Sequence, residues 1–196
     1  MEIAGAILAG GKSTRFGGAP KGLVRLPSSI TLVERLLAEF EFAGIRNVAI
    51  CSDDCYSYGA FGRQVLPDQS PGLGPLAGIE SALAHFAADA EAVVFLACDL
   101  PFITATEIKS LIAAWYRSGK PVAYAETPDF IRHPLCSVVH IDVVDEVRAA
   151  LAEKRLSVIE LWERLAGEAV YFHDGLRFDD VDSPDDMKAV FAHPSA

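Results

Sequence analysis

The chain has 196 residues, of which 51% are hydrophobic and 22% are charged, and its formal net charge at pH 7 is −10. This length and composition are typical of a soluble globular protein, and we expect residues 1–196 to form a single domain. Nucleic acids and anionic membranes are bound through basic surfaces, so the negative charge argues against both as partners. The longest unbroken apolar run, Ala92–Cys98, is too short to cross a bilayer.

The start of the chain and its cysteines favour a cytoplasmic location. Glu2 stands where a signal peptide carries positive charge, and the apolar stretch after it leads directly into glycines. The four cysteines, Cys51, Cys55, Cys98 and Cys136, do not have the spacing of a zinc ribbon. We interpret Cys51 and Cys98, which lie in strand-like runs, as buried reduced thiols; the alternative is a disulfide or a metal pair.

The first stretch of the chain, Ile3–Lys21, joins an apolar run to a glycine-rich loop. Ile3–Leu8 predicts a buried strand, and the loop after it holds two pairs of glycines and three cations. These loop residues are Gly10, Gly11, Gly17, Gly18, Lys12, Arg15 and Lys21. Glycines let backbone N–H groups approach an anion closely, so the loop predicts phosphate binding, with the triphosphate of a nucleotide as the candidate. The alternative is a tight turn with solvated charges.

Two common phosphate loops fail on spacing. The G-x-G-x-x-G fingerprint is absent because Gly10 and Gly11 are adjacent. Gly11-Lys12-Ser13 matches the end of the pattern G-x-x-x-x-G-K-[ST], but the first glycine of that pattern falls on Ala6, inside the predicted strand. The loop therefore belongs to neither type.

The next segments carry helix and strand signals in turn. Thr31 and Glu34 have the form of a capping box, and apolar residues then recur at helical spacing until Gly44, so we expect a helix here. The following segments are expected to be the strands Asn47–Cys51 and Arg63–Leu66, with a loop at Tyr56–Gly62 between them.

A second glycine-containing loop begins at Asp68. Gly74 precedes Pro75, which suits the first turn of a helix because it has no N–H to lose, and we expect this helix to end near Ala88. Exposed N–H groups at such a helix start favour an anion or an electron-rich group. Asp68 itself is explained by loop capping if no ligand binds there.

Ala92–Ala97 is a continuous apolar run, which predicts a strand in the middle of a parallel sheet with both faces covered. The run ends in Cys98-Asp99-Leu100-Pro101. Ligands of open α/β sheets gather at the carboxyl ends of strands, where Ile3–Leu8 also delivers its loop. An acid at the tip of a buried strand needs a cationic partner, and Mg²⁺ held by one or two carboxylates and by phosphates meets that need. We therefore predict Asp99 as a metal ligand.

The rest of the chain adds further helices and strands. A capping box at Thr104 and Glu107 predicts a helix that stops before Gly119. The remaining expected elements are the strands Pro121–Ala125 and Leu135–His140, with Arg132-His133-Pro134 between them, and the structural helices Asp142–Ala152 and Val158–Leu165.

An acidic turn, Asp180-Val181-Asp182, precedes the final helix, for which Ser183 is a natural N-cap and Pro184 the first residue. If the turn is extended, both carboxylates project the same way and repel each other unless a cation or hydrogen-bond donors intervene. The alternative is a solvated acidic loop.

The sequence LAGGKSTRFGGAPKGL resembles the signature L-A-[GA]-G-x-[SG]-x-R-[MF]-G-x(n)-K of the nucleotidyltransferases that activate small phosphates, and within them most closely the molybdenum cofactor guanylyltransferases. The matching residues are Leu8, Ala9, Gly10, Gly11, Ser13, Arg15, Gly17 and Lys21. The run PGLGPLAGI, the strand before Asp99, the His-Pro pair and the acidic turn follow in the family's order. Two features depart from it: Pro20 stands before the lysine in place of an acid, and Asp180 and Asp182 stand where the family usually has asparagine.

The resemblance implies a Rossmann-like three-layer α/β/α fold with a mostly parallel sheet, of the nucleotide-diphospho-sugar transferase type. It implies that GMP passes from GTP to the phosphate of molybdopterin, with Mg²⁺ as cofactor, release of pyrophosphate, and transient contact with other proteins of cofactor biosynthesis. Lys21, Arg15 and Asp99 would be catalytic. The nucleotide would contact Leu8, Ala9, Gly10, Gly11, Lys21, Asp68, Gly74, Pro75, Leu76 and Asp99. His133, Asp180 and Asp182 would lie near the acceptor, and the two aspartates would serve either a second metal contact or altered acceptor binding.

Two other functions stay open at the level of the sequence. Cytidylyl or sugar-phosphate nucleotidyl transfer is favoured by Pro20-Lys21 and by the acidic turn. A non-catalytic GTP-binding protein would give a role to Asp53–Gly62 and Arg155–Leu165, which have none in the transfer reaction.

Overall fold

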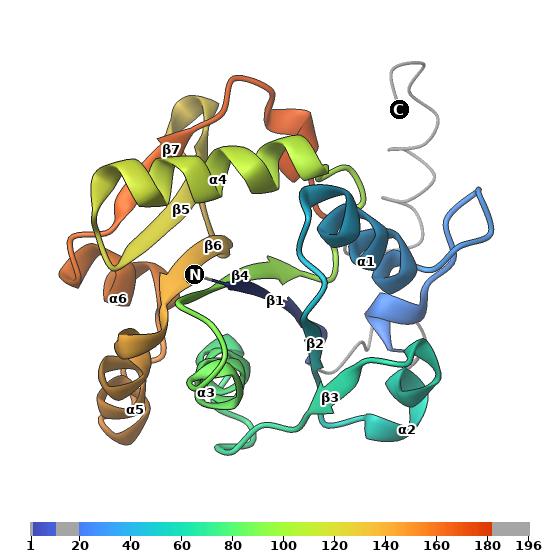
Figure 1. Ribbon diagram of the computed structural model, residues 1–196, viewed down its shortest axis with the longest axis horizontal. Helices are drawn as coiled ribbons and strands as arrows, with labels where there is room; N and C mark the ends of the chain where they lie inside the picture. The colour runs from blue at the N-terminus through green and yellow to red at the C-terminus, as the bar shows by residue number, and fades with distance from the viewer. Residues whose placement is uncertain (1, 11–19, 182–196) are drawn as a thin grey trace.

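A seven-stranded sheet forms the centre of the computed structural model, which describes residues 2–10 and 20–181 (Figure 1). Its order is β3-β2-β1-β4-β6-β5-β7. In the described chain only β6 runs against its neighbours β4 and β5; the other pairs are parallel. The strands are β1 (Ile3–Leu8), β2 (Val48–Cys51), β3 (Gln64–Leu66), β4 (Ala92–Ala97), β5 (Val122–Thr127), β6 (Ile131–His140) and β7 (Glu168–Tyr171).

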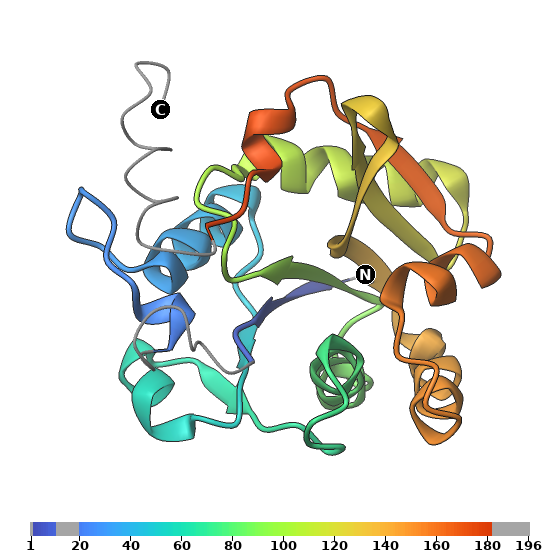
Figure 2. The same cartoon turned by 180° about the vertical axis from the view of Figure 1, so that it is seen from behind.

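Helices cover both faces of the sheet, so the molecule has three layers (Figures 1 and 2). Side chains of successive strand residues point to opposite faces. Accordingly, Ala4, Ala6 and Leu8 pack in one apolar cluster with α3, α5 and α6, whereas Ile7 packs in the other with α1 and α4. The predicted α/β class with a mostly parallel sheet is confirmed. The helices are α1 (Leu32–Ala43), α2 (Cys55–Tyr58), α3 (Pro75–Phe86), α4 (Ala105–Ser118), α5 (Val144–Ala152) and α6 (Val158–Arg164).

The carboxyl ends of the four parallel strands β3, β2, β1 and β4 lie along one edge of the sheet. Backbone hydrogen bonds just past the strands join them: Ser52 N–H donates to Leu66 O (2.9 Å), Ala9 N–H to Cys51 O (2.9 Å) and Cys98 N–H to Leu8 O (3.1 Å). From β1 the chain passes to β2 on one side, while β4 pairs with β1 on the other. Such a reversal of strand order opens a ligand crevice beyond the strand ends.

The local signals at the starts of α1 and α4 are confirmed, whereas the predicted final helix, with Ser183 and Pro184 at its start, lies outside the described residues. Thr31 with Glu34, and Thr104 with Glu107, form complete capping boxes at the starts of α1 and α4. All four cysteines are free, as expected. Within residues 2–10 and 20–181, every helix is too short or too polar to cross a membrane.

Three local predictions were wrong. Tyr56–Gly62 is not a loop: it holds most of α2 and a 3₁₀ turn, η3 (Gly59–Phe61), because Asp54 caps α2 by accepting from Ser57 N–H (3.0 Å). A helix of four residues is too short to show helical periodicity. The strand β7 and the 3₁₀ turn η6 (Gly175–Phe178) were not predicted at all.

The third error concerns Arg132-His133-Pro134, which lies inside β6 rather than between two strands. Ala125 of β5 pairs with His133, and the preceding residue Tyr124 pairs with Ser137, so the register shifts here. Pro134 has no N–H to donate to a neighbouring strand. Its carbonyl accepts a hydrogen bond from Trp162 Nε1 (2.9 Å), outside the sheet. This register shift, a β-bulge, lets β6 continue on both sides of Pro134. It places His133 at the carboxyl edge of the neighbouring strands.

Candidate active site

Lys21 and Asp99, 78 residues apart in the chain, form an ion pair at the carboxyl edge of β1 and β4. Lys21 Nζ donates to Asp99 Oδ2 at 2.8 Å. Their side chains are 17% and 24% exposed, so the pair is partly buried but open to a ligand. The structure thus brings together the cation and the acid that the sequence nominated separately.

The two side chains are delivered by different elements. Lys21 begins a 3₁₀ turn, η2 (Lys21–Leu23), and Asp99 follows the end of β4. The Asp99 backbone carbonyl accepts from Val181 N–H at 3.0 Å, so the segment that carries Asp180 returns to this point. Three separate parts of the chain therefore meet at Asp99.

The carboxylates at this edge suit a metal that is shared with a ligand. In the described ranges there is no cluster of three or more histidine, cysteine or acidic side chains that could enclose a metal ion. Mg²⁺ at nucleotide sites uses one or two carboxylates together with phosphate oxygens. Asp99 is placed to supply one such carboxylate, so these residues fit Mg²⁺ held jointly with a phosphate rather than in a protein cage.

Asp68 lies two strands further along the same edge, after β3. Its backbone N–H donates to Asp53 Oδ1 at 3.0 Å, and burial, followed by the nearby Asp53 charge, raises the pKa of the Asp68 carboxyl. A Cβ atom at Gly78 would lie 3.6 Å from Asp68 Oδ1 and 3.2 Å from Leu8 Cδ2. The Asp68 carboxylate therefore reaches over α3 towards the end of β1.

The first turn of α3 lies beside Asp68. Gly74, the N-cap, has φ +75°, a conformation that favours glycine, and Pro75 is the first helical residue. Leu76 is fully buried, and Leu8 and Ala9 are only 9% and 7% exposed. A ligand could therefore meet little of Leu8 and Ala9, and it meets no exposed surface of Leu76.

His133 and Asp180 form a third group at the edge. His133 Nε2 lies 2.9 Å from Thr127 Oγ1, and its ring packs against Phe178 with centroids 5.0 Å apart. Burial lowers the pKa of His133, while the negative charges of Asp180 and Asp179 act in the opposite direction. His133 and Asp180 are thus close enough to interact, on the β6 side of Asp99.

The lowered pKa of His133 predicts a stability loss in acid. The folded protein binds this proton less readily than the unfolded chain, so the contribution is fully present above the unfolded pKa of about 6.5 and is lost as the pH falls through the folded value. The Tm of the native protein is expected to fall more between about pH 7.5 and about pH 5.5 than that of a His133→Asn variant. Thermal unfolding at both pH values measures this, with the exposed His173→Asn as control; equal slopes for all three proteins would contradict it.

Several predicted residues cannot be placed, and others enter the site unpredicted. Gly11, Arg15 and Asp182 lie outside the described residues. Asp53, which orients the Asp68 backbone, and Gly78, which makes room for the Asp68 carboxylate, were not selected from the sequence. Their signals were present, since Asp53 lies two residues after the predicted strand Asn47–Cys51 and Gly78 lies in the run PGLGPLAGI.

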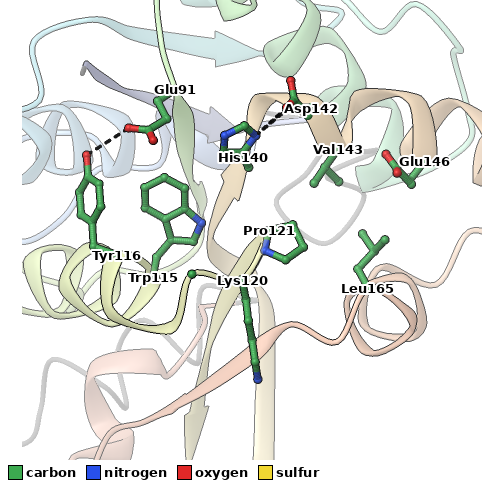
Figure 3. Close-up of a pocket in the computed structure, with 11 residues that line it drawn as sticks. Glu91, Trp115, Tyr116, Lys120, Pro121, His140, Asp142, Val143, Glu146 and Leu165 are labelled. Carbon is green, nitrogen blue, oxygen red and sulfur yellow. Dashed lines mark hydrogen bonds and ion pairs between the residues drawn. The ribbon is translucent and has the colours of Figure 1, made fainter.

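A pocket of about 440 Å³ lies at the opposite, amino edge of the sheet (Figure 3). Glu91 precedes β4, and His140 ends the antiparallel β6. The pocket also contains the carboxylates of Asp142 and Glu146, which would repel a phosphate. Its place and its charge therefore make it a poor triphosphate site compared with the carboxyl edge of the sheet at Lys21 and Asp99.

Comparison with known proteins identifies the family. Residues 5–167 match the model of the MobA-like NTP transferase domain. A molybdenum cofactor guanylyltransferase from Serratia proteamaculans is 33% identical over 153 residues, which cover 77% of this chain and 74% of that protein. The chain belongs to the MobA-like NTP transferase family. The predicted family and the predicted class, a nucleotidyltransferase, are confirmed.

Other members and structural neighbours of the MobA-like NTP transferase chain agree with this assignment. A molybdenum cofactor guanylyltransferase from Haemophilus influenzae is 28% identical over 191 residues, 96% of this chain and 97% of its own. The crystal structure of a molybdopterin-guanine dinucleotide biosynthesis protein A from Archaeoglobus fulgidus has a TM-score of 0.75 at 23% identity, covering 97% and 96% of the two chains. CMP:2-keto-3-deoxy-manno-octonic acid synthetase complexed with CTP has a TM-score of 0.76 at 15% identity, covering 98% of each chain. The structural matches establish the nucleotidyltransferase fold.

Proposed function

We propose that this protein transfers GMP from GTP to the phosphate of molybdopterin, forming the guanine dinucleotide cofactor and pyrophosphate. The relatives named above as molybdenum cofactor guanylyltransferases support this substrate pair. The observation that carries the proposal is the 2.8 Å contact between Lys21 Nζ and Asp99 Oδ2 at the reversal of strand order. It supplies a cation and an acid where open α/β sheets bind their ligands.

The nucleotide lies, in this proposal, along the carboxyl edge between the Lys21–Asp99 pair and Asp68. The Asp68 carboxylate accepts from donors on the guanine edge or holds the ribose, and the first turn of α3 offers N–H groups beside it. Nucleotide contacts are proposed at Leu8, Ala9, Gly10, Gly11, Lys21, Asp68, Gly74, Pro75, Leu76 and Asp99.

The reaction needs positioning and neutralisation of charge rather than a covalent protein intermediate. The acceptor phosphate attacks the α-phosphorus in line, and pyrophosphate leaves. The Lys21 ammonium has three donors, so it can keep its bond to Asp99 while donating to a phosphate oxygen, and Arg15 is proposed to assist it. Mg²⁺, held by Asp99 and the phosphates, would neutralise negative charge on the phosphate oxygens when bound.

The acceptor is proposed to bind on the β6 side of Asp99. His133, Asp180 and Asp182 are the candidate contacts, and the first two lie near each other in the structure. A neutral His133 can donate or accept a hydrogen bond there, which suits the polar ring edges and the phosphate of a pterin.

Pyrophosphate release tests the proposal. With molybdopterin and Mg²⁺ present, we expect release from GTP to exceed release from CTP, UTP or ATP, and the guanine dinucleotide to form in equal amount. The same mixtures without molybdopterin are the control.

Each other outcome points to one of the rival functions. Dominant release with CTP or UTP would replace the guanine assignment by cytidylyl or sugar-phosphate transfer, which Pro20-Lys21 and Asp180 favour. Tight binding of GTP with no product from any acceptor would indicate a non-catalytic GTP-binding protein.

A further inference from the structure

The hydroxyl of Tyr58, on the short helix α2, is buried without a hydrogen-bond partner among the described residues. The residue is fully buried, and its ring packs near Phe61 with centroids 6.2 Å apart. A buried polar group without a partner costs free energy, so native proteins keep few of them. Phenylalanine would fill the same space without this cost, and the oxygen of Tyr58 therefore calls for an explanation.

The Tyr58 hydroxyl lies against the residue that follows Lys21. A Cβ atom at Gly22 would lie only 2.8 Å from Tyr58 Oη and 2.7 Å from Val33 Cγ2, closer than real Cβ atoms approach. The turn η2 therefore rests directly on Tyr58 and Val33, and it can come this close only because Gly22 has no side chain. Both cartoon views place α2 beside this turn (Figures 1 and 2).

The same hydroxyl lies near the residue that precedes Asp99. Tyr58 and Cys98 belong to one apolar cluster, together with Ala9 and Val33. Burial raises the pKa of the Tyr58 phenol, and the nearby Cys98 thiol adds to the rise, while the backbone N–H of Gly22 acts in the opposite direction; the net effect is a raised pKa, so the hydroxyl stays neutral. Tyr58 thus touches the chain immediately after Lys21 and approaches it immediately before Asp99.

We propose that Tyr58 is a positioning residue, whose hydroxyl end sets the spacing between the Lys21 turn and the end of β4. It rests on the proposed function, because the spacing matters most if Lys21 and Asp99 act on one triphosphate. The hydroxyl makes the side chain longer than phenylalanine. Its contact with Gly22 holds η2 at the distance from the end of β4 that lets Lys21 Nζ reach Asp99 Oδ2. The segment containing α2, to which the sequence analysis assigned no role in the transfer reaction, then positions the two residues of the site through Tyr58.

The conservative variant Tyr58→Phe separates positioning from packing. We expect its Tm to equal or exceed that of the native protein, because an unpaired buried hydroxyl is removed. We expect its kcat for pyrophosphate release to fall about tenfold, since a misplacement of about 1 Å can cost up to about 10²-fold. An unchanged kcat would overturn the proposal, and so would a fall in kcat that is matched by a fall in Tm.

A second pair of variants tests the contact from the other side. Gly22→Ala adds a methyl group that meets Tyr58 Oη, and it should lower kcat more than it raises the KM for GTP. A Gly22 Cβ atom would also lie 2.7 Å from Val33 Cγ2, so the rescue is measured with Val33→Ala present in both proteins. In that background, adding Tyr58→Phe to Gly22→Ala should restore part of the lost kcat, because the oxygen that the methyl group meets is gone. The matched control is Gly59→Ala, next to Tyr58, where φ is −62° and a Cβ atom meets nothing within 4 Å. No rescue in the Val33→Ala background would overturn the proposal.

Crystal structures keep this inference distinct from the proposed function. If the native protein releases no pyrophosphate with any nucleotide, the proposed function fails by itself. The positioning role is then decided by the Lys21 Nζ–Asp99 Oδ2 separation in Tyr58→Phe and Gly22→Ala. A longer separation in both supports it, and a contact that stays at the native 2.8 Å overturns it.

Discussion

An Asp99→Asn variant is expected to release pyrophosphate from GTP and molybdopterin about 10²–10³ times more slowly than the native protein, because the carboxylate that pairs with Lys21 and is proposed to hold Mg²⁺ against the phosphates loses its charge. Asparagine has nearly the same shape as aspartate, so the change removes the charge that faces Lys21 and the proposed metal. The measurement is kcat under saturating GTP, molybdopterin and Mg²⁺.

The Asp99→Asn variant should still fold. Both partners of its ion pair are partly exposed, and such pairs contribute about 0–1 kcal/mol to the free energy of unfolding, so Tm should move little. Asp89→Asn, at an exposed position after α3, is the matched control for the loss of one negative charge. Near-native turnover in folded Asp99→Asn would remove Asp99 from the mechanism.

Lys21→Ala is expected to lower kcat by a similar factor, about 10²–10³, because the ammonium that pairs with Asp99 is proposed to donate to a phosphate oxygen. Lys109→Ala, at an exposed position on α4, controls for the loss of one positive charge. In the double variant with Asp99→Asn, the two losses should not add, because groups that act as one unit are strongly non-additive. Additive losses would show that Lys21 and Asp99 act independently, and this would contradict the joint site.

The sequence predicted those parts of the fold that depend on local physics. The capping boxes at Thr31 and Thr104 involve residues three apart, and their hydrogen bonds form wherever the helix forms. The strands Ile3–Leu8 and Ala92–Ala97 were predicted with their bounds, because a strand buried on both faces is apolar throughout.

Elements held in place by distant partners were missed. Half-buried and exposed residues alternate along β7, so no residue of this strand is fully buried. Its pairing with β5 depends on residues more than 40 positions earlier in the chain. β6 extends through Pro134 because Trp162, on α6, takes up the free carbonyl. Such partners leave no trace in a local pattern of hydrophobic residues.

By itself, the sequence determined the candidates for the site: the glycines and cations of the first loop, the acid after the apolar strand, and the proline at the start of α3. Each is a local choice, because a strand end or a helix start exposes backbone groups and side chains whatever lies around it. Only the tertiary structure decided which of them meet. The pairing of β1 with β4 places Lys21 on Asp99, and the return of the chain at Val181 brings Asp180 to the same point. Tyr58, which no local pattern marks, meets Gly22 next to Lys21 and packs in one apolar cluster with Cys98, because contact between segments far apart in the chain depends on how the layers pack.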